Sequence, residues 1–564
     1  MIGNSFANGE NYVSSSNTNK SDIFNEPEKK IIVYESQIAE DSPIPPATST
    51  DNTKHHSAFY SFWRFIANFS QKIDSLGMIE STGIERIPSY QRGTKKTQFL
   101  HVLGFWISAS GGLSSMSSFF LGPLLFGLTF KQSVVSGWIS MMIGCLIAAY
   151  CSIMGPQSGC RQMVTARYLF GWYFVKFVAL VSIIGVLGWS VVNCVVGGEM
   201  LASIGNVPIW VGIVIVTCVS IVVAICGIKQ VLRVEMYLSI PVMTVFTLLF
   251  ISGSDKFHLI NEYKPTSDTS IKGNWLCFFS LCYSITSTWG SITSDYYILF
   301  PEDTPKIHVF LLTFFGLLIP TTYVGLLALC LASTAMSYEP WLNSYNEYGM
   351  GGMLWSGFQR WNGFGKFCVV VLLLSLISNN IINTYSAAFS VQLSSVRLAK
   401  IPRWFWAFVV TAIYLICALV GRNHFSDILS NFLPMIGYWI SMYFILLFEE
   451  NVIFRKHFLY LYTREFPNLT TSNTSQLKQA LKYRKVRYNW EAWEDDKVLT
   501  RGLAATFAFI CGIGGVAISM SQTYWIGPVA VKLDNGDIAM WLSMGISGLV
   551  YPPCRYLELK KFGR

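Results

Sequence analysis

Twelve long stretches follow one another along this chain of 564 residues, and they contain no Asp, Glu, Lys or Arg except Lys532 near the end of the eleventh. Each is long enough to cross the roughly 30 Å hydrocarbon core of a bilayer as a helix, and a helix satisfies its own backbone hydrogen bonds in lipid. The sequence therefore predicts an all-α membrane protein with twelve transmembrane helices. The last stretch, which contains Pro552 and Pro553, is the weakest candidate. The stretches are residues 97–130, 132–160, 177–198, 200–228, 236–254, 273–294, 309–338, 367–396, 404–421, 428–448, 502–533 and 538–554.

The composition agrees with a chain whose main solvent is lipid. Hydrophobic residues make up 52% of it and charged residues 13%, and the mean hydropathy of +0.42 is higher than water-soluble domains usually reach. The 13 cysteines lie singly, without the paired spacing of a zinc site or a disulfide framework. No nucleotide loop, zinc-protease helix or nucleophile elbow occurs. We therefore expect neither an enzyme nor an ATP-driven pump, with no cofactor and no metal site.

Positive charge is distributed unevenly between the two sides that twelve spans would create. The side that holds both termini has 26 Lys and Arg residues in segments 86–98, 154–172, 228–233, 301–306, 393–403, 451–501 and 554–564, and the segments of the opposite side have 8. Without residues 451–501 the balance is still 16 to 8. Because cytosolic segments are enriched in Lys and Arg, we expect both termini to be cytosolic. The net charge of +9 then reflects topology rather than a nucleic-acid partner.

The predicted organisation has five parts. Residues 1–85 are rich in Ser, Asn, Glu and Lys, so they have too little apolar surface for a core and should form a disordered cytosolic tail. Residues 97–448 would form spans 1–10, and residues 449–500 a cytosolic loop. Spans 11 and 12 would occupy residues 501–554, and residues 555–564 would be a cytosolic C-terminal tail.

Two stretches are too polar for helices that face lipid. Residues 108–118 in span 1 contain six serines and two glycines, and residues 284–295 in span 6 are rich in Ser and Thr. Spans interrupted at corresponding positions of two repeats mark the central site of many secondary transporters. These two are five spans apart, as two inverted repeats of five helices require. Small and hydroxyl residues also permit close helix packing, but two matched spans favour a transport core over residues 97–448.

Aromatic and amide side chains near mid-span are candidates for binding a flat, polar-rimmed ring. Trp189 and Asn193 are four residues apart in span 3 and share a helical face. An indole is a flat apolar platform, and an amide both donates and accepts hydrogen bonds. Trp289 in span 6 is a second candidate platform. For any single tryptophan, packing or a position at the membrane interface is the alternative.

Polar groups within spans 3, 6 and 8 need partners or a wet cavity. Residues 378–384 carry several amides, which should face the protein interior; hydrogen bonds between helices are the alternative. Asp295 and Glu199 are the candidates for exchanging a proton during transport. For Asp295, a cap or an ion pair near the cytosolic face is the alternative.

Several motifs together resemble the fungal purine-cytosine permeases of the nucleobase:cation symporter-1 family, with coverage from about residue 77 to residue 564. Within that family the closer resemblance is to the carriers of vitamin B6. The family motifs are residues 159–171, the Trp189 and Asn193 pair, and residues 294–296, 379–383 and 557–564. The closer match lies in residues 155–160, 297–305, 357–366 and 551–555.

The resemblance implies a LeuT-like 5+5 inverted repeat followed by two C-terminal helices. It also implies proton-coupled uptake across the plasma membrane. A substrate ring would lie between tryptophans of spans 3 and 6, with polar contacts from spans 1, 3 and 8. Carried over to this sequence, the binding residues are Ser115, Trp189, Asn193, Trp289, Asn380 and Asn383.

One position departs from the purine-cytosine pattern. Ile382 stands where those permeases have proline, which puts the nucleobase contacts beside Asn383 in doubt. A pyridine alcohol such as pyridoxine suits an aromatic sandwich rimmed by amides, so vitamin B6 uptake is the first hypothesis. A purine or cytosine symporter is the second. A nutrient sensor that binds without transporting, with the tail and residues 451–501 as signalling parts, is the third.

Overall fold

The computed structural model describes residues 84–225, 228–265, 270–399, 401–467 and 487–564. Most of the predicted tail, residues 1–83, and residues 468–486 of the predicted loop lie outside this description. In the described part the only strands are β1 (Ser521–Gln522) and β2 (Trp525–Ile526), which pair antiparallel. Everything that spans the molecule is helical, as the sequence predicted.

The first half contains long, continuous helices and short ones that lie where a longer helix is interrupted. They are α3 (Lys95–Ser110), α4 (Leu113–Phe119), α5 (Leu121–Leu124), α6 (Phe130–Ser152), α7 (Gly155–Ser158), α8 (Gln162–Thr165), α9 (Arg167–Gly205), α10 (Ile209–Ala224) and α11 (Ile228–Gly253). The 3₁₀ helices η1 (Ser89–Gln91) and η2 (Ser254–Asn261) flank this set.

The second half also contains both long and short helices. Its helices are α12 (Ile271–Ser287), α13 (Lys306–Ala335), α14 (Glu339–Phe358), α15 (Asn362–Ser394), α16 (Val396–Ala399), α17 (Arg403–Gly421), α18 (Phe425–Glu449), α19 (Arg455–His457), α21 (Leu503–Ser519), α22 (Pro528–Val531) and α23 (Ala539–Phe562). Short turns of 3₁₀ or π helix are η3 (Thr288–Ser291), η4 (Thr293–Tyr296), η5 (Gln359–Trp361), η6 (Glu450–Phe454), η7 (Leu459–Leu461) and η9 (Trp490–Ala492).

Seven helical segments in the described residues are long and apolar enough to cross a membrane, and two shorter apolar helices accompany them. The count of twelve spans therefore stays a prediction. The seven are Phe130–Ser158, Arg167–Gly205, Val231–Asn261, Lys306–Ala335, Glu339–Ser394, Arg403–Gly421 and Phe425–His457, and the shorter two are Ile209–Ala224 and Leu503–Ser519.

The helices differ from the predicted segments in several places. The stretch 200–228 is divided, because its first residues complete α9 and a new helix begins only at Ile209. The stretch 502–533 ends its helix at Ser519 and continues into the β1–β2 hairpin. The helix α14 was not predicted at all. The absence of charge identifies apolar length but does not show where a helix ends.

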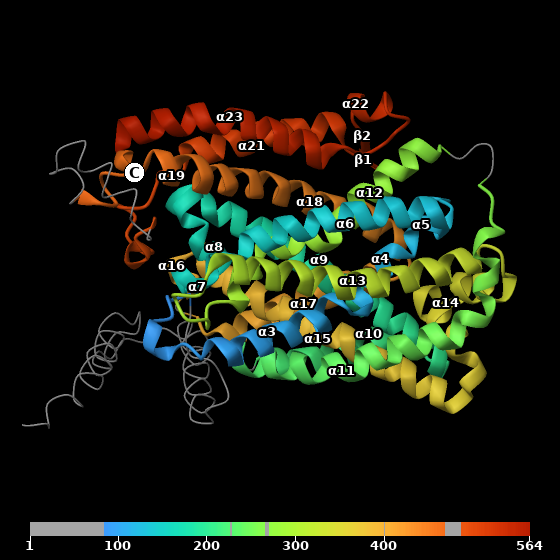
Figure 1. Cartoon of the computed structure of the whole chain (residues 1–564). Helices are drawn as coiled ribbons and strands as arrows, with labels where there is room; N and C mark the ends of the chain where they lie inside the picture. The colour runs from blue at the N-terminus through green and yellow to red at the C-terminus, as the bar shows by residue number, and fades with distance from the viewer. Residues whose placement is uncertain (1–83, 226–227, 266–269, 400, 468–486) are drawn as a thin grey trace, which may run out of the picture. The chain divides into compact units, whose positions relative to one another are not determined.

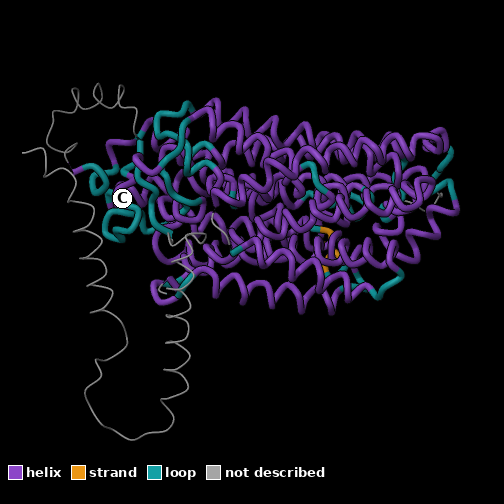
Figure 2. Tube along the Cα trace, turned by 90° about the horizontal axis from the view of Figure 1, so that it is seen from below, coloured by secondary structure: helices purple, strands orange, loops and turns teal. Residues whose placement is uncertain are grey.

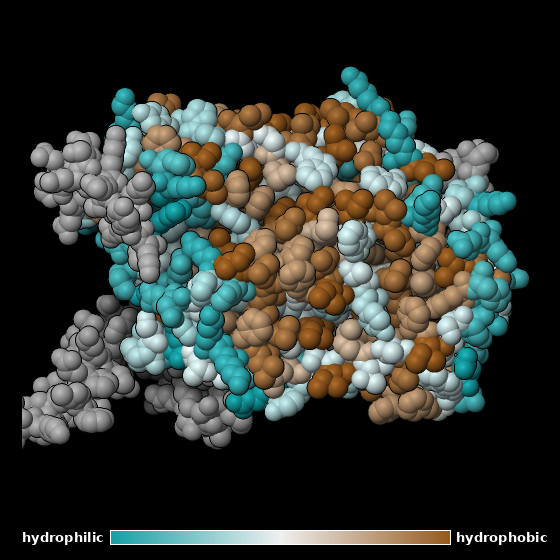
Figure 3. All heavy atoms as spheres, in the orientation of Figure 1, coloured by the Kyte–Doolittle hydropathy of each residue, from teal (hydrophilic) through white to brown (hydrophobic). Residues whose placement is uncertain are grey.

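The long helices lie side by side, and α9 packs against α15 while α12 packs against α6 (Figures 1 and 2). Helices α21 and α23 pack against each other and against α18, at one edge of the bundle in Figure 1. Hydrophobic residues gather over the middle of the helices on the face in Figure 3, and hydrophilic residues gather at both ends. This distribution is the one expected of a protein embedded in a bilayer.

Spans 1 and 6 are both interrupted, which confirms that part of the prediction. In span 1 the chain leaves α3 at Gly111, and Gly112 is extended (φ −99°, ψ 176°) before α4 begins. A methyl group at Gly111 would lie 2.9 Å from the Cβ of Pro320, so glycine is needed for this close approach. In span 6, α12 gives way to η3 and η4, with Ile292 non-helical between them (φ −137°, ψ −1°).

Candidate substrate-binding site

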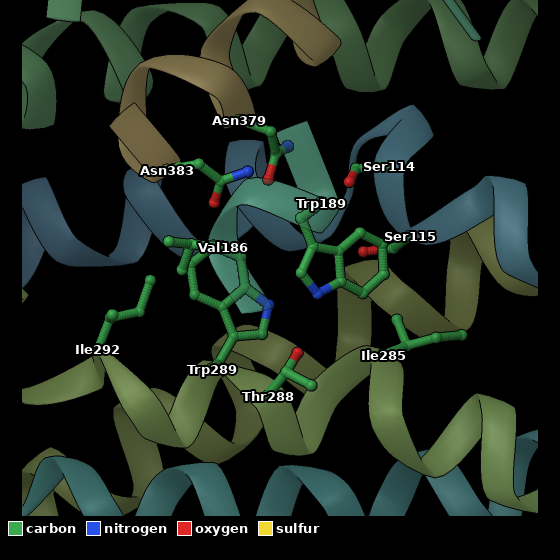
Figure 4. Close-up of a pocket in the computed structure, with 10 residues that line it drawn as sticks. All are labelled: Ser114, Ser115, Val186, Trp189, Ile285, Thr288, Trp289, Ile292, Asn379 and Asn383. Carbon is green, nitrogen blue, oxygen red and sulfur yellow. The ribbon is translucent and has the colours of Figure 1, made fainter. Parts of the chain in front are cut away.

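A cavity lies where the two interrupted spans meet α9 and α15 (Figure 4). It is lined by Ser114, Ser115, Val186, Trp189, Ile285, Thr288, Trp289, Ile292, Asn379 and Asn383. Four of the six predicted binding residues therefore line one cavity: Ser115, Trp189, Trp289 and Asn383.

The two indoles supply the flat surfaces of the cavity. Trp189 and Val186 come from one face of α9, three residues apart. Trp289 comes from η3, and its ring meets Trp106 of α3 edge to face, with centroids 5.3 Å apart and planes at 85°. Figure 4 shows both indoles turned into the same space. Such surfaces favour a planar ring over a flexible aliphatic ligand.

Hydroxyl and amide groups form the polar part of the lining. Ser114 and Ser115 come from α4, Thr288 from η3, and Asn379 and Asn383 from α15 (Figure 4). These groups both donate and accept hydrogen bonds without carrying charge. The cavity is therefore suited to a neutral ring that carries hydroxyl, amine or carbonyl groups at its edge.

Asn379 also fixes the geometry of the site. Its Nδ2 donates to the carbonyl oxygen of Ala109 at 3.1 Å, at the end of α3. The backbone N–H of Leu113, the first residue of α4, donates to Oγ of Ser375 at 3.2 Å. The interruption of span 1 leaves two backbone groups without a partner in their own helix. Side chains of α15 form hydrogen bonds with both, as buried backbone groups require.

The other two predicted binding residues lie behind the wall rather than in it. Asn193 and Asn380 are 0% exposed, and neither lines the cavity. Nδ2 of Asn380 donates to Sγ of Cys194 at 3.2 Å. In this structure the pair connects α9 to α15 directly beside Trp189 and Asn379.

The two predicted proton-exchanging carboxyls both accept hydrogen bonds from backbone N–H groups. Oδ1 of Asp295 accepts from the N–H of Gln162 at 2.7 Å. Oε2 of Glu199 accepts from the N–H of Met350 at 2.9 Å, just after Gly349 interrupts α14 in a left-handed conformation (φ +58°). These contacts match the capping role that was the alternative for Asp295, and neither carboxyl lines the cavity.

A second cavity adjoins the first. Asp295, Arg161 and Ser390 are among its lining residues, and Ile292 borders both cavities. Arg161 stacks on the ring of Phe389 at 3.4 Å and donates to the hydroxyl of Tyr385 at 2.9 Å. Ile292 therefore lies where the two spaces meet.

Sequence reasoning missed several residues of the site. Ser114, Thr288 and Asn379 stand next to, or four residues from, predicted residues in the same polar runs, so the runs carried the signal. The apolar members Val186, Ile285 and Ile292 resemble any other core residue. A further omission is Glu235, a 0% exposed carboxyl in α11, because the search for charge-free stretches treated it as a boundary.

The arrangement provides binding groups and no reacting groups. No cluster of three His, Cys, Asp or Glu side chains that could hold a metal occurs in the described residues. The cavity has aromatic platforms and neutral polar groups, next to breaks in two helices. Such a site can bind a ring and release it when the helices move, which is the chemistry of a carrier.

Known proteins share both the sequence and the fold. The model of a family described as permease for cytosine/purines, uracil, thiamine and allantoin matches residues 87–527. The vitamin B6 transporter TPN1 of Saccharomyces cerevisiae is 68% identical over 521 residues, which cover 88% of this chain and 90% of that protein. The purine-cytosine permease fcyB of Emericella nidulans is 30% identical over 490 residues, covering 86% and 90%.

Solved structures support the same fold. The structure of Mhp1, a nucleobase-cation-symport-1 family transporter in a closed conformation with bromovinylhydantoin bound, has a TM-score of 0.59 at 12% identity. It covers 86% of this chain and 96% of the Mhp1 chain. The inward-facing conformation of Mhp1 has a TM-score of 0.54. With this fold and these relatives, the chain belongs to the nucleobase:cation symporter-1 family of membrane transporters, the permeases for cytosine/purines, uracil, thiamine and allantoin.

Proposed function

We propose that this protein takes up vitamin B6, as pyridoxine and related vitamers, in symport with protons across the plasma membrane. The observation that carries the proposal is the 68% identity to a vitamin B6 transporter over 521 residues. The remaining arguments concern how the site would hold such a substrate.

The chemistry of the cavity suits pyridoxine. The pyridine ring would lie against the indoles of Trp189 and Trp289, as aromatic faces prefer. Its hydroxyl groups would exchange hydrogen bonds with Ser115 and Asn383 of the lining. Asn193 and Asn380 would affect the site indirectly, because they set the position of α9 against α15. They would contact substrate only if those helices move.

The architecture we propose is the one the sequence predicts. Twelve spans with both termini cytosolic would comprise the transport core of residues 97–448 as a 5+5 inverted repeat, and the two C-terminal helices within residues 501–554. Residues 1–85, 449–500 and 555–564 would be cytosolic. The matched interruptions of spans 1 and 6 support the repeat, and the excess of Lys and Arg supports the orientation.

A nucleobase symporter is the second candidate function. The 30% identity to a purine-cytosine permease covers nearly the same residues, and a neutral polar-rimmed ring describes cytosine as well as pyridoxine. Ile382 argues for a different substrate, because α15 continues through this position as an unbroken helix. A proline there would remove a backbone hydrogen bond and kink the helix next to Asn383.

Competition for uptake separates the two functions. Cells that express the protein, in a host without its own carriers, should accumulate labelled pyridoxine, and excess unlabelled pyridoxine should abolish the signal. Excess cytosine or adenine should leave it unchanged. Accumulation of labelled cytosine that pyridoxine does not inhibit would select the nucleobase function. Binding of pyridoxine without any flux in proteoliposomes would indicate a sensor.

A further inference from the structure

Glu235 is a carboxyl group wholly enclosed among three helices. It is the eighth residue of α11 (Ile228–Gly253), so at 1.5 Å per residue it lies about 10 Å along the axis from the start of the helix. Its exposure is 0%. An ionisable side chain inside a membrane helix is expensive and is usually functional.

The hydrogen bonds that the structure shows for Glu235 come from a hydroxyl group. Oγ of Ser378 in α15 lies 2.6 Å from Oε1 of Glu235 and 2.5 Å from Oε2. One hydroxyl has a single hydrogen, which an anionic carboxylate must share between its two oxygens. A protonated carboxyl can instead accept from this hydroxyl with one oxygen and donate to it with the other. Ser108 of α3 supplies a second hydroxyl beside the same carboxyl.

No cation balances this carboxyl. No ion pair involves Glu235 in the part of the chain that the structure describes, and a buried anion without a partner is costly. Arg233, two residues earlier on α11, is exposed. Tyr296 of η4, which interacts electrostatically with Glu235, is an uncharged neighbour whose hydroxyl lies 3.2 Å from that of Ser386.

The other charged groups near this region have partners of their own. Asp295, next to Tyr296 in the chain, accepts a hydrogen bond from the backbone of Gln162, and Arg161 lies close enough to oppose its charge. On α3, His101 lies seven residues before Ser108, which is about 10 Å along the helix. Glu235 is therefore surrounded mainly by hydroxyl groups, and a proton is what compensates its charge.

The partners of Glu235 adjoin the helix break that forms the cavity. Ser378 precedes Asn379, which lines the cavity, and Ser108 precedes Ala109, whose carbonyl oxygen accepts from Asn379 at 3.1 Å. The carboxyl thus joins α11 to both helices that hold the break together. Loss of its proton would leave an anion there, and water would have to enter between α11, α3 and α15 to solvate it.

We propose that Glu235 is the proton-binding group of this protein, an inference that rests on the proposed function as a proton-coupled carrier. The carboxyl is neutral while α11 packs against α3 and α15. It is deprotonated when those helices separate. The proton moves between the Glu235 carboxyl and water, and no other bond changes. Glu199 and Asp295 instead accept hydrogen bonds from backbone N–H groups, those of Met350 and Gln162.

Two transport modes of purified full-length protein in proteoliposomes test the proposal. Accumulation of labelled pyridoxine driven by a pH gradient needs proton release, whereas exchange with internal pyridoxine at equal pH does not. Glu235→Gln keeps the shape of the neutral acid. The exchange rate of this variant should stay within about threefold of that of the unmodified protein. Its gradient-driven accumulation should fall by about tenfold or more. Glu449→Gln, a half-buried carboxyl at the end of α18, is the matched control and should keep both modes.

Three results would overturn the proposal. The first is accumulation by Glu235→Gln that follows the pH gradient as in the unmodified protein. The second is loss of exchange in a folded variant, because the amide should mimic the protonated acid. If the glutamine variant is not recovered, Ser378→Ala decides: the midpoint of the pH profile of uptake should move to higher pH by about half a unit, because the hydroxyl that donates to the carboxylate is lost, and an unchanged midpoint is the third.

The result for the unmodified protein separates this inference from the proposed function. If the unmodified protein does not transport pyridoxine at all, the substrate assignment fails. The same two modes then apply to labelled cytosine. If the unmodified protein accumulates either substrate in response to a pH gradient, and Glu235→Gln does so equally well, only the role of Glu235 fails.

Discussion

The side-chain amide of Asn193 in α9 donates a hydrogen bond to Oδ1 of Asn380 in α15 at 3.0 Å. Both residues are fully buried and lie behind the cavity lining. The two amides therefore act as one connection between helices. A buried amide that loses its partner costs about 1–3 kcal/mol, so either single change should disturb the wall that carries Trp189 and Asn379.

We expect Asn193→Ala and Asn380→Ala each to reduce pyridoxine uptake strongly, and the double variant to be no worse than the more severe single. The coupling energy from a double-mutant cycle of KM or thermal stability should be about 1 kcal/mol or more. Additive losses would show that each amide contacts the substrate independently, as the sequence comparison implied.

The indole platforms should dominate substrate affinity. Trp189→Ala and Trp289→Ala should each weaken pyridoxine binding about tenfold or more, because a stacking face worth about 0.5–1.5 kcal/mol and the buried area are both lost. Phenylalanine at either position should restore part of the affinity. Titration of purified protein with pyridoxine measures this. Trp210→Ala, at an exposed position of α10, is the control and should bind normally.

Ile292 borders the central cavity and the cavity that contains Asp295 and Arg161. A larger side chain there should obstruct passage between the two without touching the stacking faces. We expect Ile292→Trp to lower the rate of pyridoxine uptake about tenfold while equilibrium binding changes little. Equal loss of binding and flux would show that the larger side chain fills the binding space rather than the passage between the two cavities.

A buried ionic cluster should be essential for folding. Glu450 is 1% exposed and pairs with Arg455 at 3.0 Å and with Arg555 of α23 at 3.1 Å. Glu450→Ala would leave two buried guanidinium groups without this partner, at a cost of about 3–5 kcal/mol. The variant should lose most of its thermal stability in detergent. Glu491→Ala, which removes an exposed partner of Arg86, should change stability by less than about 1 kcal/mol.

Asp537 should make stability depend on pH. It lies between α22 and α23, and burial raises its pKa to about 6 from about 3.8. Because the folded state holds this proton more tightly, its contribution to stability is complete below pH 3.8 and is lost as pH rises through 6. Asp537→Asn, which stays neutral, should therefore gain melting temperature relative to the unmodified protein between pH 4 and pH 7. A constant difference across that range would contradict the assignment.

Much of the fold could be predicted from patterns that physical chemistry makes unavoidable. Helices in lipid need long charge-free runs, and the runs around Ser115 and Trp289 were too polar to be continuous lipid-facing helices. What could not be predicted are contacts that form across the fold. The helix α14 begins again after Gly349, where Glu199 accepts from the next N–H group. The boundary after Gly205, by contrast, has a local signal, because Asn206 ends α9 in a left-handed conformation (φ +51°) and Pro208 precedes α10.

The site divides in the same way. Trp189 and Asn383 could be selected because large aromatic and amide groups are conspicuous at mid-span. The side chain of Asn193 can face either the substrate or Asn380. Which of the two it faces depends on the rotation of α9 against α15, and no local sequence pattern indicates that rotation. The environment of Glu235 could not be predicted, because Ser378, whose hydroxyl contacts it, is 143 residues away in the sequence.

The extended backbone at Gly112 also bears on how such a protein keeps its membrane sealed. A continuous first span would move as one rod, so a displacement at one end would also displace the other. With the two pieces joined only at this point, one piece can lean away while the other stays closed. Ions then have no uninterrupted path, and the cell keeps the voltage across its bilayer while it imports a nutrient.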